Sequence, residues 1–126
     1  MRRLAAVGLL LVAIACGKES TPLVTQARGV VDDVTHARWD DARKNFAPLL
    51  AQSLSSQQLA AGWATFVKVK GAYRSTGDAG VVERPNFTVV NIVLHMAKGD
   101  GQARVTFDKK GQIAGLFFLQ PGVPVP

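Results

Sequence analysis

The sequence is poor in the side chains on which many enzymes and metal sites depend. Its 126 residues include one cysteine, two histidines and one tyrosine. A single thiol excludes an internal disulfide and a cluster of cysteine ligands. The two histidines, His36 and His95, form no His-x-His pair, and no Gly-x-Ser-x-Gly motif or phosphate-binding loop occurs. The sequence therefore favours a protein without catalysis, metal or other cofactor, although it does not decide against an enzyme.

Long runs of like charge are also missing. The formal net charge is +6, and without the two N-terminal arginines 13 basic residues face nine acidic ones, which leaves +4. The tightest basic groups are Lys68 with Lys70 and Lys109 with Lys110. Neither approaches the run of five or more cations that is typical of a nucleic-acid-binding arm. We expect no nucleic-acid partner, and at most a weak attraction to anionic lipid headgroups.

One apolar run stands out, over residues 4–14. It follows Arg2 and Arg3, is too short to span a bilayer as a stable helix, and ends in small or apolar residues before Cys16. This pattern is typical of a cleavable export signal. The segment MRRLAAVGLLLVAIAC resembles the bacterial lipobox, whose cysteine is linked to a diacylglycerol and carries fatty acids such as palmitate. An ordinary secretory signal with an incidental cysteine is the alternative.

The signal divides the chain into four parts. We expect a signal peptide, a lipidated cysteine with a polar tether, a single domain and a Pro-rich tail, over residues 1–15, 16–21, 22–120 and 121–126. The 111 residues left after cleavage suffice for one core. The lipid would anchor the protein to a membrane of the bacterial cell envelope. Because Gly17 is not the aspartate that retains enteric lipoproteins at the inner membrane, a host with two membranes would carry it on the outer one, facing the periplasm.

The first half of the domain has helical periodicity. Apolar residues at spacings of three and four predict a helix over residues 22–36, with Thr21 as its N-cap. A second helical stretch opens at Asp40 and has Leu49 among its apolar positions. Pro48 lies inside this stretch, so we expect it to kink or restart the helix there.

The third predicted helix has the strongest end signals. Ser55 and Gln58 have the spacing of a capping box, and Gly71 is a natural C-terminal stop. Between them, Trp63 and Phe66 lie on one apolar face. We interpret this face as part of the hydrophobic core.

After this helix the hydrophobic period falls to two. Strands are expected over residues 73–76, 81–83, 87–96, 103–107 and 112–119. Turns are expected at residues 77–80, 84–86, 98–101 and 108–111. Because the connections are short, neighbouring strands should be antiparallel and form a meander. Helices followed by an antiparallel sheet indicate an α+β fold.

Both faces of the predicted sheet carry apolar residues. The strand over residues 87–96 has Val90, Ile92, Leu94 and Met96 on one face and Phe87, Val89 and Val93 on the other. In the last strand, alternation places Ile113, Phe117 and Leu119 together. Helices on one side alone would leave a polar outer face, so something should cover the second face. A two-fold homodimer is the preferred explanation, with another envelope protein or the Pro-rich tail as alternatives.

Over residues 39–120 the chain resembles a bacterial family, the domain of unknown function 3887. The pattern appears in the segments ARWDDARKNF, SSQQLAAGW, VKGAYRS, TVVNIVLHM and VTFDKKGQIAGLFF. That family is similar to the nuclear transport factor 2-like (SnoaL-like) superfamily, which implies helices packed in a curved, cone-like sheet. The superfamily holds isomerases and dehydratases as well as binding and dimerisation modules, so the fold alone does not choose a function.

Two sets of side chains are candidates for a binding site. The aromatic set would line a cavity between the helices and the sheet and hold a small apolar ligand: Trp63, Tyr73, Phe107 and Phe117. The polar set is Asn91 and His95, which share a face of their strand and would lie in such a cavity or at its rim.

The residues favour a lipid-anchored module that binds something rather than transforming it. The first hypothesis is a homodimer or docking on another envelope protein, and the second is a carrier of a small apolar ligand. An enzyme of the isomerase or dehydratase kind comes last. Such an enzyme uses a buried aspartate as its base, and every aspartate here falls in a predicted turn or at a helix surface or end.

Overall fold

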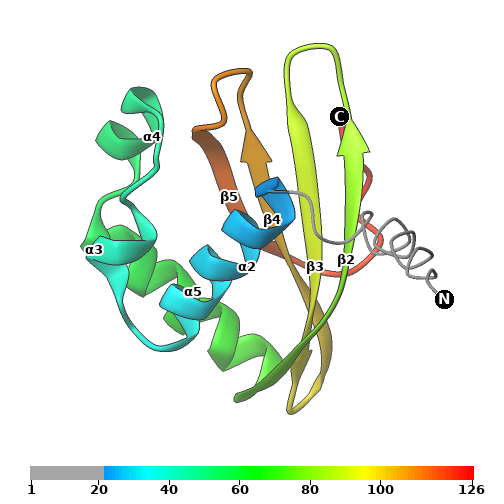
Figure 1. The fold of residues 1–126 in the computed structure, drawn as a ribbon. Coiled ribbons are helices and arrows are strands. Elements are labelled where there is room, and N and C mark those ends of the chain that lie inside the picture. The colour runs from blue at the N-terminus through cyan, green and yellow to red at the C-terminus, as the bar shows by residue number, and fades with distance from the viewer. Residues whose placement is uncertain (1–21) are drawn as a thin grey trace, which may run out of the picture.

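A computed structural model of the chain describes residues 22–126 as an α+β fold, which confirms the predicted fold class (Figure 1). The helices are α2 (Pro22–Thr35), α3 (Trp39–Ala42), α4 (Pro48–Ser53) and α5 (Ser56–Lys70). The strands are β2 (Tyr73–Glu83), β3 (Thr88–Met96), β4 (Gly99–Phe107) and β5 (Ile113–Leu119). The predicted signal peptide, Cys16, the tether and the N-cap Thr21 lie outside the described residues. Within the described part, no helix is long and apolar enough to cross a bilayer.

The two long helices form where the sequence predicts them. α2 buries one face against the sheet: Val24, Ala27, Val30, Val31 and Val34. At the start of α5 the capping box is complete, because the Gln58 amide donates to Ser55 Oγ at 3.1 Å and the Ser55 amide donates to Gln58 Oε1 at 2.9 Å. α5 stops at Gly71, whose φ of 83° lies in the left-handed region that favours glycine.

The second predicted helix is two short helices, α3 and α4. Between them the chain reaches the sheet, where Phe46 forms an isolated bridge with Ile113 and the Ala47 amide donates to the Ile113 carbonyl at 2.7 Å. Pro48 then opens α4, a position that costs no hydrogen bond. Of the four apolar positions predicted for this stretch, Ala42, Phe46 and Leu50 lie in or against the core, whereas Leu49 is 79% exposed.

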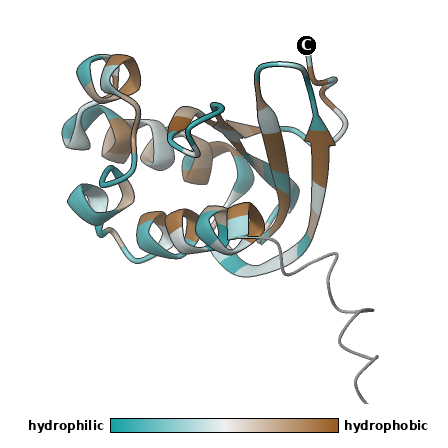
Figure 2. Cartoon of the chain, turned by 45° about the horizontal axis from the view of Figure 1, so that its top comes forward, coloured by the Kyte–Doolittle hydropathy of each residue, from teal (hydrophilic) through white to brown (hydrophobic). Residues whose placement is uncertain are grey.

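The sheet is a four-stranded antiparallel meander in the order β2-β3-β4-β5. Its inner face holds the core under the helices, and the side chains of Val90, Ile92, Leu94, Val105 and Phe107 are fully buried there. In Figure 2, hydrophobic stretches run along the strands, while α2 alternates between hydrophobic and hydrophilic sides. The other face of the sheet, called the outer face below, carries no helix in the described part of the chain (Figure 1).

The turn predicted at residues 77–80 is wrong, because β2 runs through it as one strand. Thr76 pairs with Leu94 and Ala79 with Ile92, so β2 has one extra residue opposite β3 at this point. Such a bulge bends a strand without ending it. Gly77 suits the bulge because a Cβ there would come within 3.1 Å of the Val93 Cβ.

The turn predicted at residues 98–101 is shorter than expected. Met96 pairs with Gly99, so the hairpin turn is Ala97–Lys98 and the two following glycines belong to β4. Gly101 is needed for packing rather than for a turn, because a Cβ there would collide with the Phe66 ring of α5. A glycine inside a strand often marks such a close approach.

The predicted grouping of Ile113 with Phe117 on one face of the last strand is also wrong. Phe107 pairs with Ile113 and Thr106 with Gly115, so a bulge adds one residue to β5 between these pairs. The extra residue reverses the alternation. Ile113 therefore faces the core, and Phe117 lies on the outer face.

Candidate functional site

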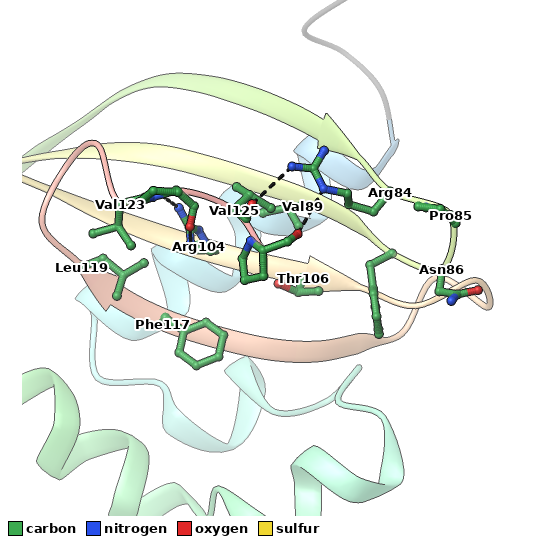
Figure 3. A pocket seen from close by; sticks show the side chains of 13 residues that line it. Arg84, Pro85, Asn86, Val89, Arg104, Thr106, Phe117, Leu119, Val123 and Val125 are labelled. Atoms are coloured by element: carbon green, nitrogen blue, oxygen red, sulfur yellow. Dashed lines mark hydrogen bonds between the residues drawn. The ribbon is translucent and has the colours of Figure 1, made fainter.

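The candidate site is a groove on the outer face of the sheet, where the C-terminal tail runs back across the strands (Figure 3). The groove has a volume of about 640 Å³ and is largely apolar. One wall is the tail and the other is β5, with the β2–β3 turn at one end. The residues used below are Phe87, Val89, Arg104, Phe117, Val123 and Val125.

Two arginines hold the tail by its main-chain carbonyl groups. Arg104 of β4 donates to the Val123 carbonyl and, at 3.1 Å, to the Pro124 carbonyl. Arg84, which follows β2, donates to the Val125 carbonyl at 3.2 Å and to the main-chain oxygen of Pro126 at 3.1 Å. A guanidinium is a planar fork with five N–H donors, so each arginine bridges two consecutive carbonyls. These bonds recognise an extended backbone rather than particular side chains.

Arg104 is 6% exposed, and its surroundings satisfy the buried cation. Its Nε donates to Asn91 Oδ1 at 2.8 Å, and Gln102 Nε2 donates to the same oxygen at 3.2 Å. A buried charge is costly unless hydrogen bonds surround it. Because Arg104 is fixed from below by Asn91, its remaining donors point at the tail and set where the tail lies.

The open part of the groove exposes aromatic rings. Phe117 is 51% exposed and Phe87 is 45% exposed, whereas Val89, which also lines the groove, is only 4% exposed. The groove therefore offers apolar contact area rather than reactive groups, and its chemistry suits the binding of an apolar surface.

The predicted aromatic set is divided between the two faces of the sheet. Trp63 lies edge-on to Phe118 and Tyr73, with ring centroids 5.0 and 6.3 Å apart, so these rings pack on one another. Phe107 is fully buried in the same core, toward the other end of β4. Phe117 alone lies on the outer face and lines the groove.

The predicted polar set is divided as well. Asn91 lies beneath the tail as a partner of Arg104. His95 is on the same face but near the β3–β4 turn, where its Nδ1 lies 2.8 Å from Asp100 Oδ1 and both side chains are about half exposed. Asn91 therefore contributes to the groove, and His95 contributes to a surface pair outside it.

Electrostatic effects on the helical side are those of surface ion pairs. Hydrogen bonds to Asp33 and then Asp32 raise the pKa of Arg38, and a hydrogen bond to Asp41 raises the pKa of Lys44. All of these groups lie on or beside α2 and α3, away from the groove. Among residues 22–126, no three His, Cys, Asp or Glu side chains gather closely enough to hold a metal ion.

Sequence reasoning missed the two arginines. One signal for Arg104 was present, because it is a cation in the middle of a predicted strand. Its neighbours Ala103 and Val105 face the core, so alternation places Arg104 on the outer face. Its partners are carbonyl groups, which every residue carries. No residue type in the tail could therefore have identified them.

The model of one protein family matches residues 27–116, and its description is "Protein of unknown function (DUF3887)". No curated protein matches the chain.

Proposed function

Since this chain belongs to the DUF3887 family of proteins of unknown function, we propose its role from its own surface: a lipid-anchored, non-catalytic interaction module of the cell envelope. It forms a two-fold homodimer through the outer face of the sheet. The observation that carries the proposal is the half-exposed Phe117 ring beside an open apolar groove.

The groove collects apolar side chains that a monomer would leave in water. Two of the exposed large apolar side chains, Phe117 and Val123, line it between β5 and the tail, and a third, Phe87, lies at its end in the β2–β3 turn. Contiguous apolar patches larger than a few hundred Å² are uncommon on monomers and often mark interfaces. Each copy offers a projecting ring and a hollow beside it, so two copies related by a two-fold axis would fill each other's grooves. Such self-complementarity is what a two-fold interface requires.

The proposed anchor supports pairing even through a small interface. The lipobox-like segment that ends at Cys16 would hold every copy at one membrane. Confinement raises the effective concentration at which two copies meet. An interface around one groove then suffices where it would be weak between freely diffusing proteins.

A carrier of a small apolar ligand is the second candidate. The groove volume of about 640 Å³ lies within the range of roughly 300–1,000 Å³ that is usual for ligand sites. The ligand would then lie on the outer face. The space between helices and sheet is filled by packed rings such as Trp63 and Phe118.

Native mass spectrometry of the chain from Gly17 onward separates these functions. We expect a dimer for the wild type and a folded monomer for Phe117→Glu, because pairing would desolvate the new carboxylate. Val81→Glu is the matched control: Val81 is 42% exposed on β2 and does not line the groove, so this variant should stay dimeric. A monomer that carries an apolar molecule would favour the carrier, and an empty wild-type monomer at high micromolar concentration would contradict both.

A further inference from the structure

One end of the domain combines exposed apolar and basic side chains. This loop end consists of α4, the β2–β3 turn over residues 84–87 and the β4–β5 turn over residues 108–112, which lie together in Figure 1. Antiparallel pairing places both turns at the same end, since Thr88 pairs with Phe107. The bond from the Ala47 amide to the Ile113 carbonyl fixes the start of α4 beside them.

The side chains of the loop end suit a membrane surface. Leu49 is 79% exposed and Phe87 is 45% exposed, and both line one hollow with Lys109 and Lys110. No ion pair between described residues engages either lysine. The nearby Asp108 carboxylate instead accepts hydrogen bonds from the backbone amides of Lys110 and Gln112, each at 2.9 Å. Both ammonium groups are therefore available to an anionic surface.

The start of α2 lies at the same end of the domain. Asn45 Nδ2 donates both to Gln26 Oε1 of α2, at 2.8 Å, and to the Gly111 carbonyl of the β4–β5 turn, at 2.9 Å. Cys16 is six residues before Pro22, so even a fully extended tether spans only about 20 Å. A lipid on Cys16 would keep the loop end, rather than the opposite end, beside the bilayer.

We propose that the loop end rests on an anionic bilayer, with Leu49 and Phe87 in the interface and Lys109 and Lys110 at the headgroups. The inference rests on the lipid anchor of the proposed function. Apolar side chains enter the interfacial region favourably, and basic residues are attracted to anionic lipids within a Debye length. Four side chains are a weak anchor by themselves, so their role is to orient a protein that the lipid already holds. The strands then run away from the membrane, and the outer face stands upright toward neighbouring copies.

The test is site-directed fluorescence on the full lipidated protein in vesicles that contain phosphatidylglycerol. With Cys16 acylated, an introduced cysteine is the one free thiol for an environment-sensitive dye. Leu49→Cys reports the loop end, and Ala97→Cys, in the exposed turn at the opposite end, is the control. We expect nitroxide-labelled lipids to quench the Leu49→Cys dye at least threefold more than the Ala97→Cys dye. Equal quenching, or stronger quenching at position 97, would overturn the proposal.

A second arm tests the charge. Replacing Lys109 and Lys110 by glutamine should lower quenching of the Leu49→Cys dye at least twofold at low salt, and vesicles of phosphatidylcholine alone should have the same effect. Unchanged quenching in both cases would overturn the role of the lysines and of anionic lipid.

The intact mass separates failure of the anchor from failure of this proposal. An unmodified Cys16 would refute the anchor itself. The dye at position 49, on a Cys16→Ser background, then tests whether the loop end contacts the membrane without the anchor. Continued quenching at position 49 in anionic vesicles supports the loop end as a membrane surface, and its loss overturns that role as well.

Discussion

At the scale of single residues, Arg104 has the most consequential position in the domain. It joins the centre of the sheet to the tail, through Asn91 below and two carbonyl groups above. Without it, the carbonyls of Val123 and Pro124 would lose the donors that Arg104 provides. Asn91 Oδ1 would keep the hydrogen bond from Gln102 and lose the one from Arg104. The part of the groove wall at Val123 and Pro124 therefore depends on this side chain, whereas Arg84 holds the last two residues of the tail.

We predict that Arg104→Ala loosens the tail at Val123 and Pro124 and lowers the free energy of unfolding by roughly 1–3 kcal/mol, because its part-buried hydrogen bonds from a charged donor are lost. Urea denaturation measures the loss, and NMR relaxation of the amides of Gly122, Val123 and Val125 reports the increased mobility of the tail. Arg74→Ala, at an exposed position on β2, should change stability by less than about 0.5 kcal/mol. Unchanged relaxation of these amides in Arg104→Ala would show that other contacts hold the tail.

Trp63 of α5 packs on the core at the inner face of the sheet. Its ring meets Phe66, Tyr73 and Phe118 at centroid distances of 5.9, 6.3 and 5.0 Å. We predict that Trp63→Ala lowers the free energy of unfolding by about 3–5 kcal/mol, since the cavity cannot close fully. The urea midpoint measures it. Val69→Ala on the same helix, at a side chain that is 60% exposed, is the control, and a similar midpoint for both variants would contradict the packing.

At the scale of elements, the contact between α5 and β4 depends on a glycine. Phe66 lies directly over Gly101, so α5 approaches the strand more closely than any side chain at that position would allow. The helix thereby brings its aromatic rings onto the sheet. This close contact explains why a residue that resembles a turn glycine lies within a strand.

We predict that Gly101→Ala lowers the free energy of unfolding by about 1–3 kcal/mol, because Phe66 must move. Gly80→Ala on β2 is the matched control. A Cβ there meets nothing within 4 Å, so stability should stay the same or rise by up to about 1 kcal/mol. Chemical denaturation of both variants makes the comparison. In a double-mutant cycle, Phe66→Leu should offset part of the cost of Gly101→Ala, and strict additivity would argue against the collision.

The elements also show how far local sequence determines structure. The ends of α5 were predictable because Ser55, Gln58 and Gly71 act on backbone groups within their own turn. Gly77 and Gly101 were misread as turn residues because a glycine also suits a bulge or a close contact, and only the partner strand or helix decides between them. The shifted alternation at Ile113 has the same origin, since a bulge depends on the pairing between two strands.

At the scale of the whole molecule, the two faces of the sheet have different covers. Helices close the inner face, and the tail crosses part of the outer one. The sequence predicted that the second face needs a cover and gave the tail as one alternative. It could not indicate how the tail is held, because the arginines bind carbonyl groups that every segment possesses. The groove formed by tail and sheet was unpredictable for the same reason.

The proposed anchor has its own prediction. We expect Cys16→Ser to abolish labelling by a radioactive fatty acid and to move the protein from the membrane fraction to an uncleaved or soluble form. Equal labelling of wild type and variant would refute lipidation at this residue. In a host with two membranes, a sucrose gradient should place the wild-type protein with the outer membrane.

The order of elements along the chain has a consequence for how the domain folds. Its strands form a meander, so each hairpin closes between residues near in sequence, whereas α2 packs on strands that follow far later. A 14-residue helix is marginal when isolated in water. In the proposed export, with the N-terminus crossing the membrane first, α2 would have no sheet to cover until the strands follow. The native core cannot close before Ile113 of β5 has arrived, so this topology would delay folding until the proposed export is nearly complete.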